Sequence, residues 1–245
     1  MLCACPYAFD LPVRKIAILQ PNYIPWKGVF DLISRVDVFV FYDDVQFTAK
    51  DWRSRNRIRT PHGNHWLTVP VLSKGLRHQR ICDAVIDPRS NWQTKHYKAL
   101  KANYQKARHF RDYEYLIEEL YLANKWAKIA DLNIFATKLI AGAIGVNAEW
   151  HRSSDLGQLG SKNGERAINL CKLLGCDYFI NGPSARTFMD ASLFLENGIE
   201  LDYISYSYPE YEQLHQPFVH EVTVLDVIFN CGPNARAVVC MGQGA

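Results

Sequence analysis

A strand–helix–strand pattern near the start of the chain constrains the fold more than any other feature. Residues 14–20 (RKIAILQ) and 36–42 (VDVFVFY) are rich in β-forming residues, and residues 27–35 between them have the apolar spacing of a helix. The second stretch is almost continuously apolar, as in a central parallel strand covered on both faces. Together they predict a βαβ unit, the basic piece of a parallel sheet.

The alternation of strands and helices is interrupted once. A strand is expected at 65–72. A helix with Asn91 as its N-cap is then expected at 91–112, and one or two further helices at 113–145, the last closed by Gly145. From residue 146 strands and helices alternate again, at 148–156, 161–175, 176–182, 191–198, 199–206 and 223–232.

These patterns predict an α/β fold, a mostly parallel sheet with helices on both faces, built from Rossmann-like βαβ units and carrying a helical insertion. The expected divisions are a leader at 1–13, an N-terminal α/β half at 14–90, the insertion at 91–145, a C-terminal α/β half at 146–235 and a tail at 236–245.

Composition narrows the class of protein. Of 245 residues, 48% are hydrophobic and 22% charged, and the net charge of +3 gives no reason in itself to expect nucleic acid as a partner. No apolar run is long enough to span a membrane, and residues 1–13 lack the pattern of a signal peptide. Seven scattered cysteines are expected to be reduced thiols in a cytoplasmic protein, and no histidine spacing indicates a zinc site.

Polar residues follow the ends of the expected strands. Ligands of open parallel sheets bind in the crevice at the carboxyl ends of the strands, so these residues are candidates for binding. They are Gln20, Asn22, Asp43, Asp44, Gln46, Ser153, Ser154, Asp155, Asn181, Ser205 and Tyr206.

Asp43 and Asp44 are the candidates for catalysis, because they directly follow the most apolar strand. Buried carboxylates need a partner, which is arginine, lysine or a metal ion. In a structural interpretation, Asp44 caps a turn and Asp43 pairs with an arginine. In a functional one, one acid is the general base for an amine or hydroxyl nucleophile, or holds Mg²⁺.

A basic stretch follows the two acids. Alternate arginines in it share one face if the chain is extended there. They are either charges on a solvated edge strand or a phosphate-binding edge, and we expect some of them to supply the countercharge of the acids. The basic residues are Lys50, Arg53, Arg55, Arg57 and Arg59.

Two loops offer further anion sites. SSDLGQLGSKNGERA, residues 153–167, leads into a helix whose N–H groups and dipole favour an anion, and Lys162 would add charge. Its spacing is not that of a Walker A loop, and a plain capping loop with Ser161 as N-cap is the alternative. In NGPSARTF, Arg186 suits a phosphate or carboxylate. Trp26, in the first loop, is expected to line a pocket.

Several segments together resemble the WbqC-like family. They are QPNYIPWKGVF, DDVQF, NRIRTPHGNHWLTVPV, SSDLGQLGSKNGERAINLCKLLGCDYFINGPSARTFMD and YPEYEQLHQPFVHEVTVLDVIFNCG. The resemblance implies a protein of bacterial surface-polysaccharide clusters that transfers glycine or a related small acyl group to an amino sugar. The positions inside these motifs are Gln20, Trp26, Asp43, Asp44, Gln46, Asn56, Arg57, Ser154, Asp155, Glu165, Arg166, Gly182, Arg186, Tyr211 and Gln213.

The opening of the chain also resembles nucleotidylyltransferase-type folds, which carry a His-x-Gly-His signature in the first loop. The corresponding residues here are Trp26, Lys27, Gly28 and Val29, so both histidines are absent. This absence counts against adenylation by the usual residues, and Lys27 and the SKNGER loop are the substitutes that the sequence offers.

Three functions are compatible with these features. The first is a transferase that places a small acyl or aminoacyl group on an amino sugar or sugar nucleotide in O-antigen-type polysaccharide biosynthesis. Asp43 or Asp44 would be its base, and Arg57, Lys162 and Arg186 would bind a diphosphate. The donor is open: a thioester, an acyl carrier, an aminoacyl-tRNA, or an adenylate made with ATP and Mg²⁺.

The second function is an ATP-dependent amide-forming enzyme that works through an acyl-adenylate. The third is a non-catalytic module that binds a sugar nucleotide or RNA through the arginines and tryptophans of residues 50–66. None of the three involves insertion into a membrane.

Overall fold

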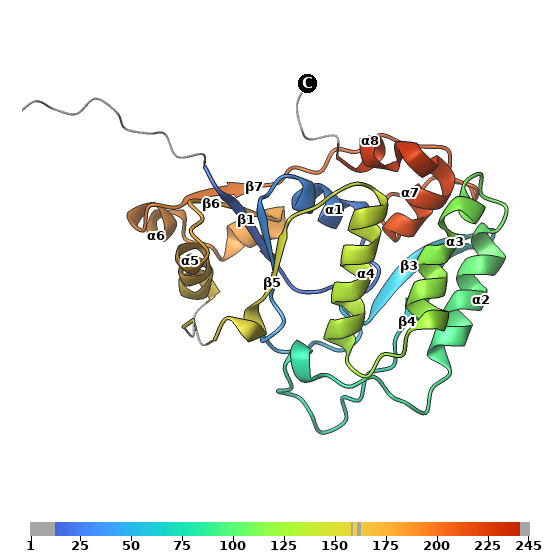
Figure 1. Cartoon of the computed structure of the whole chain (residues 1–245), viewed down its shortest axis with the longest axis horizontal. Coiled ribbons are helices and arrows are strands. Elements are labelled where there is room, and N and C mark those ends of the chain that lie inside the picture. Colours follow the sequence, from blue (N-terminus) through green and yellow to red (C-terminus); the bar gives the residue numbers. More distant parts are fainter. Residues whose placement is uncertain (1–12, 158, 161–162, 241–245) are drawn as a thin grey trace, which may run out of the picture.

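A five-stranded sheet forms the frame of the molecule in the computed structural model (Figure 1). The structure describes residues 13–157, 159–160 and 163–240. The strands lie in the order β5-β2-β1-β6-β7, and all four pairings are parallel. Their bounds are β1 Lys15–Leu19, β2 Val38–Phe41, β5 Glu149–Arg152, β6 Tyr178–Asn181 and β7 Glu200–Tyr203.

Helices cover both faces of this sheet because its central strands are apolar on both sides. Along β2, Val38 and Val40 face one hydrophobic cluster, whereas Phe39 and Phe41 face the other. The first cluster also contains side chains of α5 and α6, and the second contains side chains of α1, α4 and α7. The α/β fold that the sequence predicts is therefore confirmed. These helices are α1 Lys27–Ser34, α4 Ile129–Ala143, α5 Asn163–Leu173, α6 Ala191–Glu196 and α7 Val224–Cys231.

An antiparallel hairpin and two helices lie beside the sheet (Figure 1). The strand expected at 65–72 belongs to this hairpin, but it begins at Gly63 and ends at Thr68, since Gly63 pairs with Thr60 across a tight turn. The helix expected at 91–112 ends earlier, at Tyr104, because the His109 N–H donates to the Phe229 carbonyl of α7 rather than continuing the helix. The elements are β3 Arg55–Thr60, β4 Gly63–Thr68, α2 Trp92–Tyr104 and α3 Phe110–Glu118.

Short helical turns and one terminal helix complete the described chain. Asn91 occupies the N-cap position of α2, although its side chain makes no capping hydrogen bond. The remaining elements are the 3₁₀ turns η1 Ile81–Asp83, η3 Ser153–Asp155, η4 Pro183–Thr187 and η5 Gly232–Asn234, the π-helical turn η2 Glu119–Ala123, and helix α8 Ala235–Val239.

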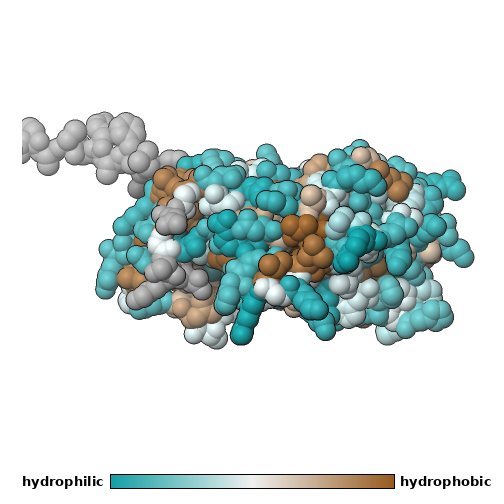
Figure 2. Space-filling model, turned by 90° about the horizontal axis from the view of Figure 1, so that it is seen from below, coloured by the Kyte–Doolittle hydropathy of each residue, from teal (hydrophilic) through white to brown (hydrophobic). Residues whose placement is uncertain are grey.

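The strand order reverses between β1 and β6. From β1 the chain proceeds to β2 and then β5 on one side, whereas β6 and β7 lie on the other. Such a switch point opens a crevice at the carboxyl ends of the two strands, which is the usual ligand site of open α/β sheets. Seen from below, the surface is mostly hydrophilic, with an apolar patch near the middle of this face (Figure 2). Among the described residues, no helix has the length and apolar character needed to cross a membrane.

Candidate functional site

A cavity of about 380 Å³ lies at the switch point. Side chains that follow β1 and β6 line its polar side, and aromatic and aliphatic side chains, among them Tyr42 and Phe179, form the rest of its wall. We call it the crevice cavity, and define it by the polar residues Gln20, Asn22, Arg53, Asn181 and Ser184. Amide groups that both donate and accept, next to a guanidinium, suit a ligand with hydroxyl or phosphate groups.

A second cavity, of about 320 Å³, lies next to the first. Indole rings form part of its wall, and one arginine and one glutamate bring opposite charges to it. We call it the arginine cavity, and its lining consists of Asn22, Pro25, Trp26, Trp52, Asn56, Arg57 and Glu221.

The two cavities share the side chains of Asn22 and Trp52. Both residues come from segments outside the helices and strands, one following β1 and the other preceding β3. The Tyr23 N–H donates to the Trp52 carbonyl at 2.9 Å, so the two segments are fastened to each other. Ligands in the two cavities would therefore be separated only by this shared wall.

Local sequence shapes the arginine cavity. Gly28 leaves room for the Trp26 indole, because a Cβ at position 28 would lie 2.4 Å from that ring. Ile24 has a positive φ of 34°, which is strained for a β-branched residue. The buried Asn56 amide donates to the Ile24 carbonyl at 2.8 Å and to the Tyr23 carbonyl at 3.2 Å, which holds this turn in place. Strained backbone maintained in this way is typical of binding sites.

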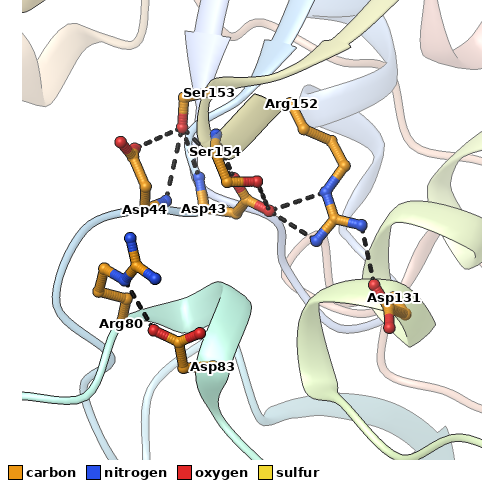
Figure 3. A network of polar contacts seen from close by, with 8 residues as sticks. All are labelled: Asp43, Asp44, Arg80, Asp83, Asp131, Arg152, Ser153 and Ser154. Carbon is orange, nitrogen blue, oxygen red and sulfur yellow. Dashed lines mark hydrogen bonds and ion pairs between the residues drawn. The ribbon is translucent and has the colours of Figure 1, made fainter. Parts of the chain in front are cut away.

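The acid pair lies in a dense polar network at the end of β2 (Figure 3). Asp43 is fully buried and pairs with Arg152 of β5, whose Nη2 is 2.8 Å from its Oδ2. The Ser154 N–H and hydroxyl both donate to Asp43 at 3.1 Å. The Ser153 hydroxyl donates to Asp44 at 2.5 Å and accepts the Asp43 N–H at 3.0 Å. Both carboxylates thus fasten the end of β2 to the end of β5.

Arg166 of α5 connects Asp44 to the crevice cavity. Its guanidinium pairs with the Asp44 carboxylate and lies over the ring of Tyr42, 5.0 Å from the centroid. Tyr42 lines the crevice cavity, and its buried hydroxyl has no hydrogen-bond partner among the described residues. Burial raises the pKa of this hydroxyl, so it stays protonated at neutral pH and can donate to a ligand.

A family model described as the WbqC-like protein family matches residues 20–238. The chain belongs to this family. A protein of Mycobacterium tuberculosis (strain ATCC 25618 / H37Rv), named Uncharacterized protein Rv1507c, is 39% identical over 224 residues, which cover 91% of this chain and 96% of the relative. No solved structure matches the chain.

The countercharge of the acids in this WbqC-like protein differs from the one expected. Arg152 and Arg166 pair with the acids, whereas the arginines of the following basic stretch do not. Arg53 instead pairs with Asp51 and donates to the Gln20 amide oxygen. The expectation is wrong because the basic stretch leaves the sheet to enter the hairpin, while β5 and α5 return to the end of β2 from more than 100 residues away.

The arginines of β3 have individual environments rather than one common role. Arg55 lies over the Trp66 ring at 4.3 Å, and Arg57 lies 5.6 Å from the Trp52 ring and 5.4 Å from that of Trp66. Arg59 is buried and donates to the His215 carbonyl at 3.4 Å. Arg57 lines the arginine cavity, so it is placed to meet a ligand there.

The other predicted site residues of this WbqC-like protein are dispersed. Asp155 and Glu165 are exposed, and Gln46 donates to the Arg77 carbonyl in another part of the surface. The Arg186 guanidinium lies over Tyr203 at the end of β7, and Gly182 donates its N–H to the Asn181 side chain. Lys162 and Ser161 are outside the described residues. Roles for all of these in binding stay predictions.

Tyr211 and Gln213 belong to a buried cluster around Asp226 of α7. The Asp226 carboxylate accepts hydrogen bonds from Tyr211 at 2.7 Å, Tyr104 at 2.8 Å and Gln213 at 3.0 Å. Burial raises the pKa of Asp226, and the three donors act in the opposite direction. The contacts of both residues hold the segment before α7 in place.

Lys27 is buried behind the Trp26 loop, which the sequence did not indicate. Its ammonium lies over the rings of Tyr208, Tyr211 and Phe218 at 5.0, 5.2 and 5.7 Å, and 3.0 Å from the Nδ1 of His220. Burial lowers the pKa of Lys27 to about 8, against the attraction of Asp226. Among the described residues, no group of three or more His, Cys, Asp or Glu side chains is arranged to hold a metal ion.

Glu221 is a charged cavity residue that sequence reasoning missed, and Trp52 and Arg53 were considered only as members of the basic stretch within residues 50–66. Trp52 and Arg53 follow Asp43 and Asp44 within ten residues, so their position in the chain could have indicated that they lie near the end of β2. Glu221 carried no such signal, since it reaches the cavity from an irregular segment before α7.

Proposed function

We propose that the protein is a transferase that attaches a small acyl or aminoacyl group, such as glycyl, to the amino group of an amino sugar or sugar nucleotide. The observation that carries the proposal is the pair of adjoining cavities that share Asn22 and Trp52. A group transfer needs two ligands held side by side, and positioning them in this way is a large part of catalysis. Surface-polysaccharide synthesis is the process in which we place the reaction, on the resemblance to the WbqC-like family.

The chemistry of each wall supports an assignment of the two ligands. The crevice cavity offers the amides of Gln20, Asn22 and Asn181, which suit the hydroxyl groups of a sugar. Its volume of about 380 Å³ accommodates a sugar rather than a whole sugar nucleotide, so the nucleotide part would extend along the surface. The arginine cavity, with its aromatic walls, would then take the donor.

The attacking amine must be neutral, so the proposal includes a general base that accepts its proton. Asp44 is the candidate, because Arg166 and Tyr42 connect it to the crevice cavity. Asp43 would act as a positioning residue through Ser154 and Arg152. The amine proton would pass to Asp44 through a ligand group or a water molecule that bridges the crevice cavity and the Asp44 carboxylate.

The test is transfer in vitro. Purified protein is incubated with isotope-labelled acyl and aminoacyl donors and a panel of amino-sugar nucleotides, and products are detected by their mass increase. We expect product with free amino sugars and none with the N-acetylated acceptors. Asn22→Ala, in the shared wall, should lower transfer at least tenfold. Absence of product from every pair would overturn the proposal.

A non-catalytic binding module is the second candidate, and one observation favours it. Trp52 and Trp66 remain 43% and 39% exposed, 5.5 Å apart, with Arg55 stacked on Trp66. Exposed indoles beside arginines suit bases of single-stranded RNA. In this case a fluorescent oligonucleotide would bind, its affinity would fall steeply with salt, and no transfer would accompany it.

A further inference from the structure

Arg57 and Glu221 bring opposite charges to one cavity without pairing with each other. Both line the arginine cavity, and among the described residues neither forms an ion pair or a side-chain hydrogen bond. The cavity therefore keeps a positive and a negative group on its wall with space between them.

Arg57 has unused hydrogen-bonding capacity. Its buried Nε has no partner among the described residues, and its Nη atoms donate no hydrogen bond to them, so the Nη groups are open to a ligand. Trp52 and Trp66 lie 5.6 and 5.4 Å from the guanidinium, and contacts of this kind hold its plane. A fixed guanidinium with free N–H groups binds carboxylate or phosphate oxygens in a defined orientation.

The negative part of the cavity suits a cation. Glu221 is exposed, and its charge is also felt by Lys27 and His220, which lie behind the wall. Trp26 and Trp52 line the same cavity, and indole rings attract an ammonium group. An ammonium ion in this position would meet a carboxylate and aromatic faces together, whereas a neutral group would gain neither attraction.

We propose that the arginine cavity binds a ligand that carries both an ammonium and an anionic group, the anion at Arg57 and the ammonium at Glu221. Two sources have this chemistry: an α-amino acid with its carboxylate, which would be the donor side of the transfer, and an amino-sugar phosphate, which would exchange the two cavities assigned above. The inference deepens the proposed function by giving the charge pattern of one substrate. It needs no transfer to be tested, so failure of one proposal is distinguishable from failure of the other.

The experiment is titration calorimetry of the full chain with two matched sets of probes. The first set is glycine, N-acetylglycine and glycinamide, and the second is glucosamine 6-phosphate, glucose 6-phosphate and glucosamine. Within one set the probe with both charges should bind at least tenfold more tightly than either probe that lacks one. The set in which this happens identifies the source of the ligand.

Substitutions assign the charges. Arg57→Gln should weaken binding of the doubly charged probe about 10- to 100-fold, and Glu221→Gln should do the same, because each removes a charged hydrogen-bond partner. Arg57→Lys should lose part of the affinity, since the charge remains without the planar fork. Arg108→Gln and Glu212→Gln, both exposed and outside the cavity, are the matched controls and should bind as the wild type does. Thermal unfolding establishes that each variant is folded.

The proposal is overturned by any of three results. One is that neither doubly charged probe binds. Another is that removing the ammonium or the anion from the probe leaves the affinity unchanged. The last is that Arg57→Lys and Glu221→Gln, both folded, bind the doubly charged probe as tightly as the wild type.

Discussion

Arg152 joins two acidic residues of different elements, since its Nη2 lies 2.8 Å from Asp43 at the end of β2 and its Nη1 lies 2.9 Å from Asp131 on α4. Asp43 is fully buried, whereas Asp131 is 45% exposed. The stability of the fold depends on Arg152 as the countercharge of Asp43, because a buried charge without a countercharge is strongly destabilising.

Arg152→Met should therefore lower the free energy of unfolding by about 3–5 kcal/mol, and Asp43→Ala should lower it by less, because Arg152 is 29% exposed and keeps Asp131 as a partner. The double variant should lose less than the sum of the two, because the second change removes an already unpaired charge. Urea unfolding measures all three. The exposed pair Arg80–Asp83, at 2.7 Å in the same region, is the control, and Arg80→Met should have almost no effect. Equal losses from both pairs would contradict the prediction.

Asp44→Asn separates a catalytic from a structural role. The amide keeps the shape of the side chain but cannot accept a proton from an amine, so transfer should fall about 10²- to 10⁴-fold if Asp44 is the base. Unfolding in urea should show that the variant is folded, and Asp112→Asn, at an exposed acid of α3, should transfer at the wild-type rate. Full activity of Asp44→Asn would remove the acid from the mechanism.

Lys27 should make stability depend on alkaline pH. Its pKa is about 8 in the folded protein and 10.5 as the ordinary value, so the unfolded chain binds more protons between these pH values. The free energy of unfolding should accordingly rise with pH through this window, by at most about 3 kcal/mol.

Lys27→Met should remove this rise. The variant should be more stable than the wild type at pH 7, and the difference should shrink towards pH 10, because the wild-type lysine is then neutral. Urea unfolding of both proteins from pH 7 to 10 gives the difference between their free energies of unfolding. Tyrosine titrations, which both proteins share, cancel in this difference. Lys98→Met, on the exposed side of α2, controls for the loss of a lysine as such. Parallel profiles would be the contrary result.

Gly28→Ala should change the shape of the arginine cavity, because it displaces the Trp26 ring that forms part of the cavity wall. The added Cβ would lie 2.4 Å from the Trp26 ring, so the indole must move. We expect a loss of about 1–3 kcal/mol in the free energy of unfolding and weaker ligand binding. Tryptophan fluorescence and calorimetry report the two effects. Gly142→Ala, where a Cβ meets nothing within 4 Å, should leave binding unchanged.

The strands and helices of the sheet were predictable because their signals are local. The apolar run of β2 and the helical spacing of α7 appear within ten residues each, and the structure has both near the expected bounds. The fold class followed from their alternation. The end of α2 at Tyr104, short of the expected residue 112, was not predictable, because a hydrogen bond from His109 to the distant Phe229 interrupts the helix there.

The candidate site was predictable only in part, for the same reason. Gln20, Asn22 and Asn181 come together because strand ends meet at one edge of a parallel sheet, a rule that needs no tertiary detail. Which arginine meets which acid depends on chain segments more than 100 residues apart, as for Asp43 and Arg152. Glu221 reaches its cavity from an irregular segment, for which no periodicity exists.

The wall formed by Asn22 and Trp52 has a thermodynamic consequence. Any shift of these two side chains on occupation of one cavity alters the shape of the other, so the two binding equilibria are linked. Linkage is reciprocal: whatever factor the first ligand applies to the affinity of the second, the second applies to the first. The order in which the two compounds arrive then changes the route to the ternary complex but not its final free energy.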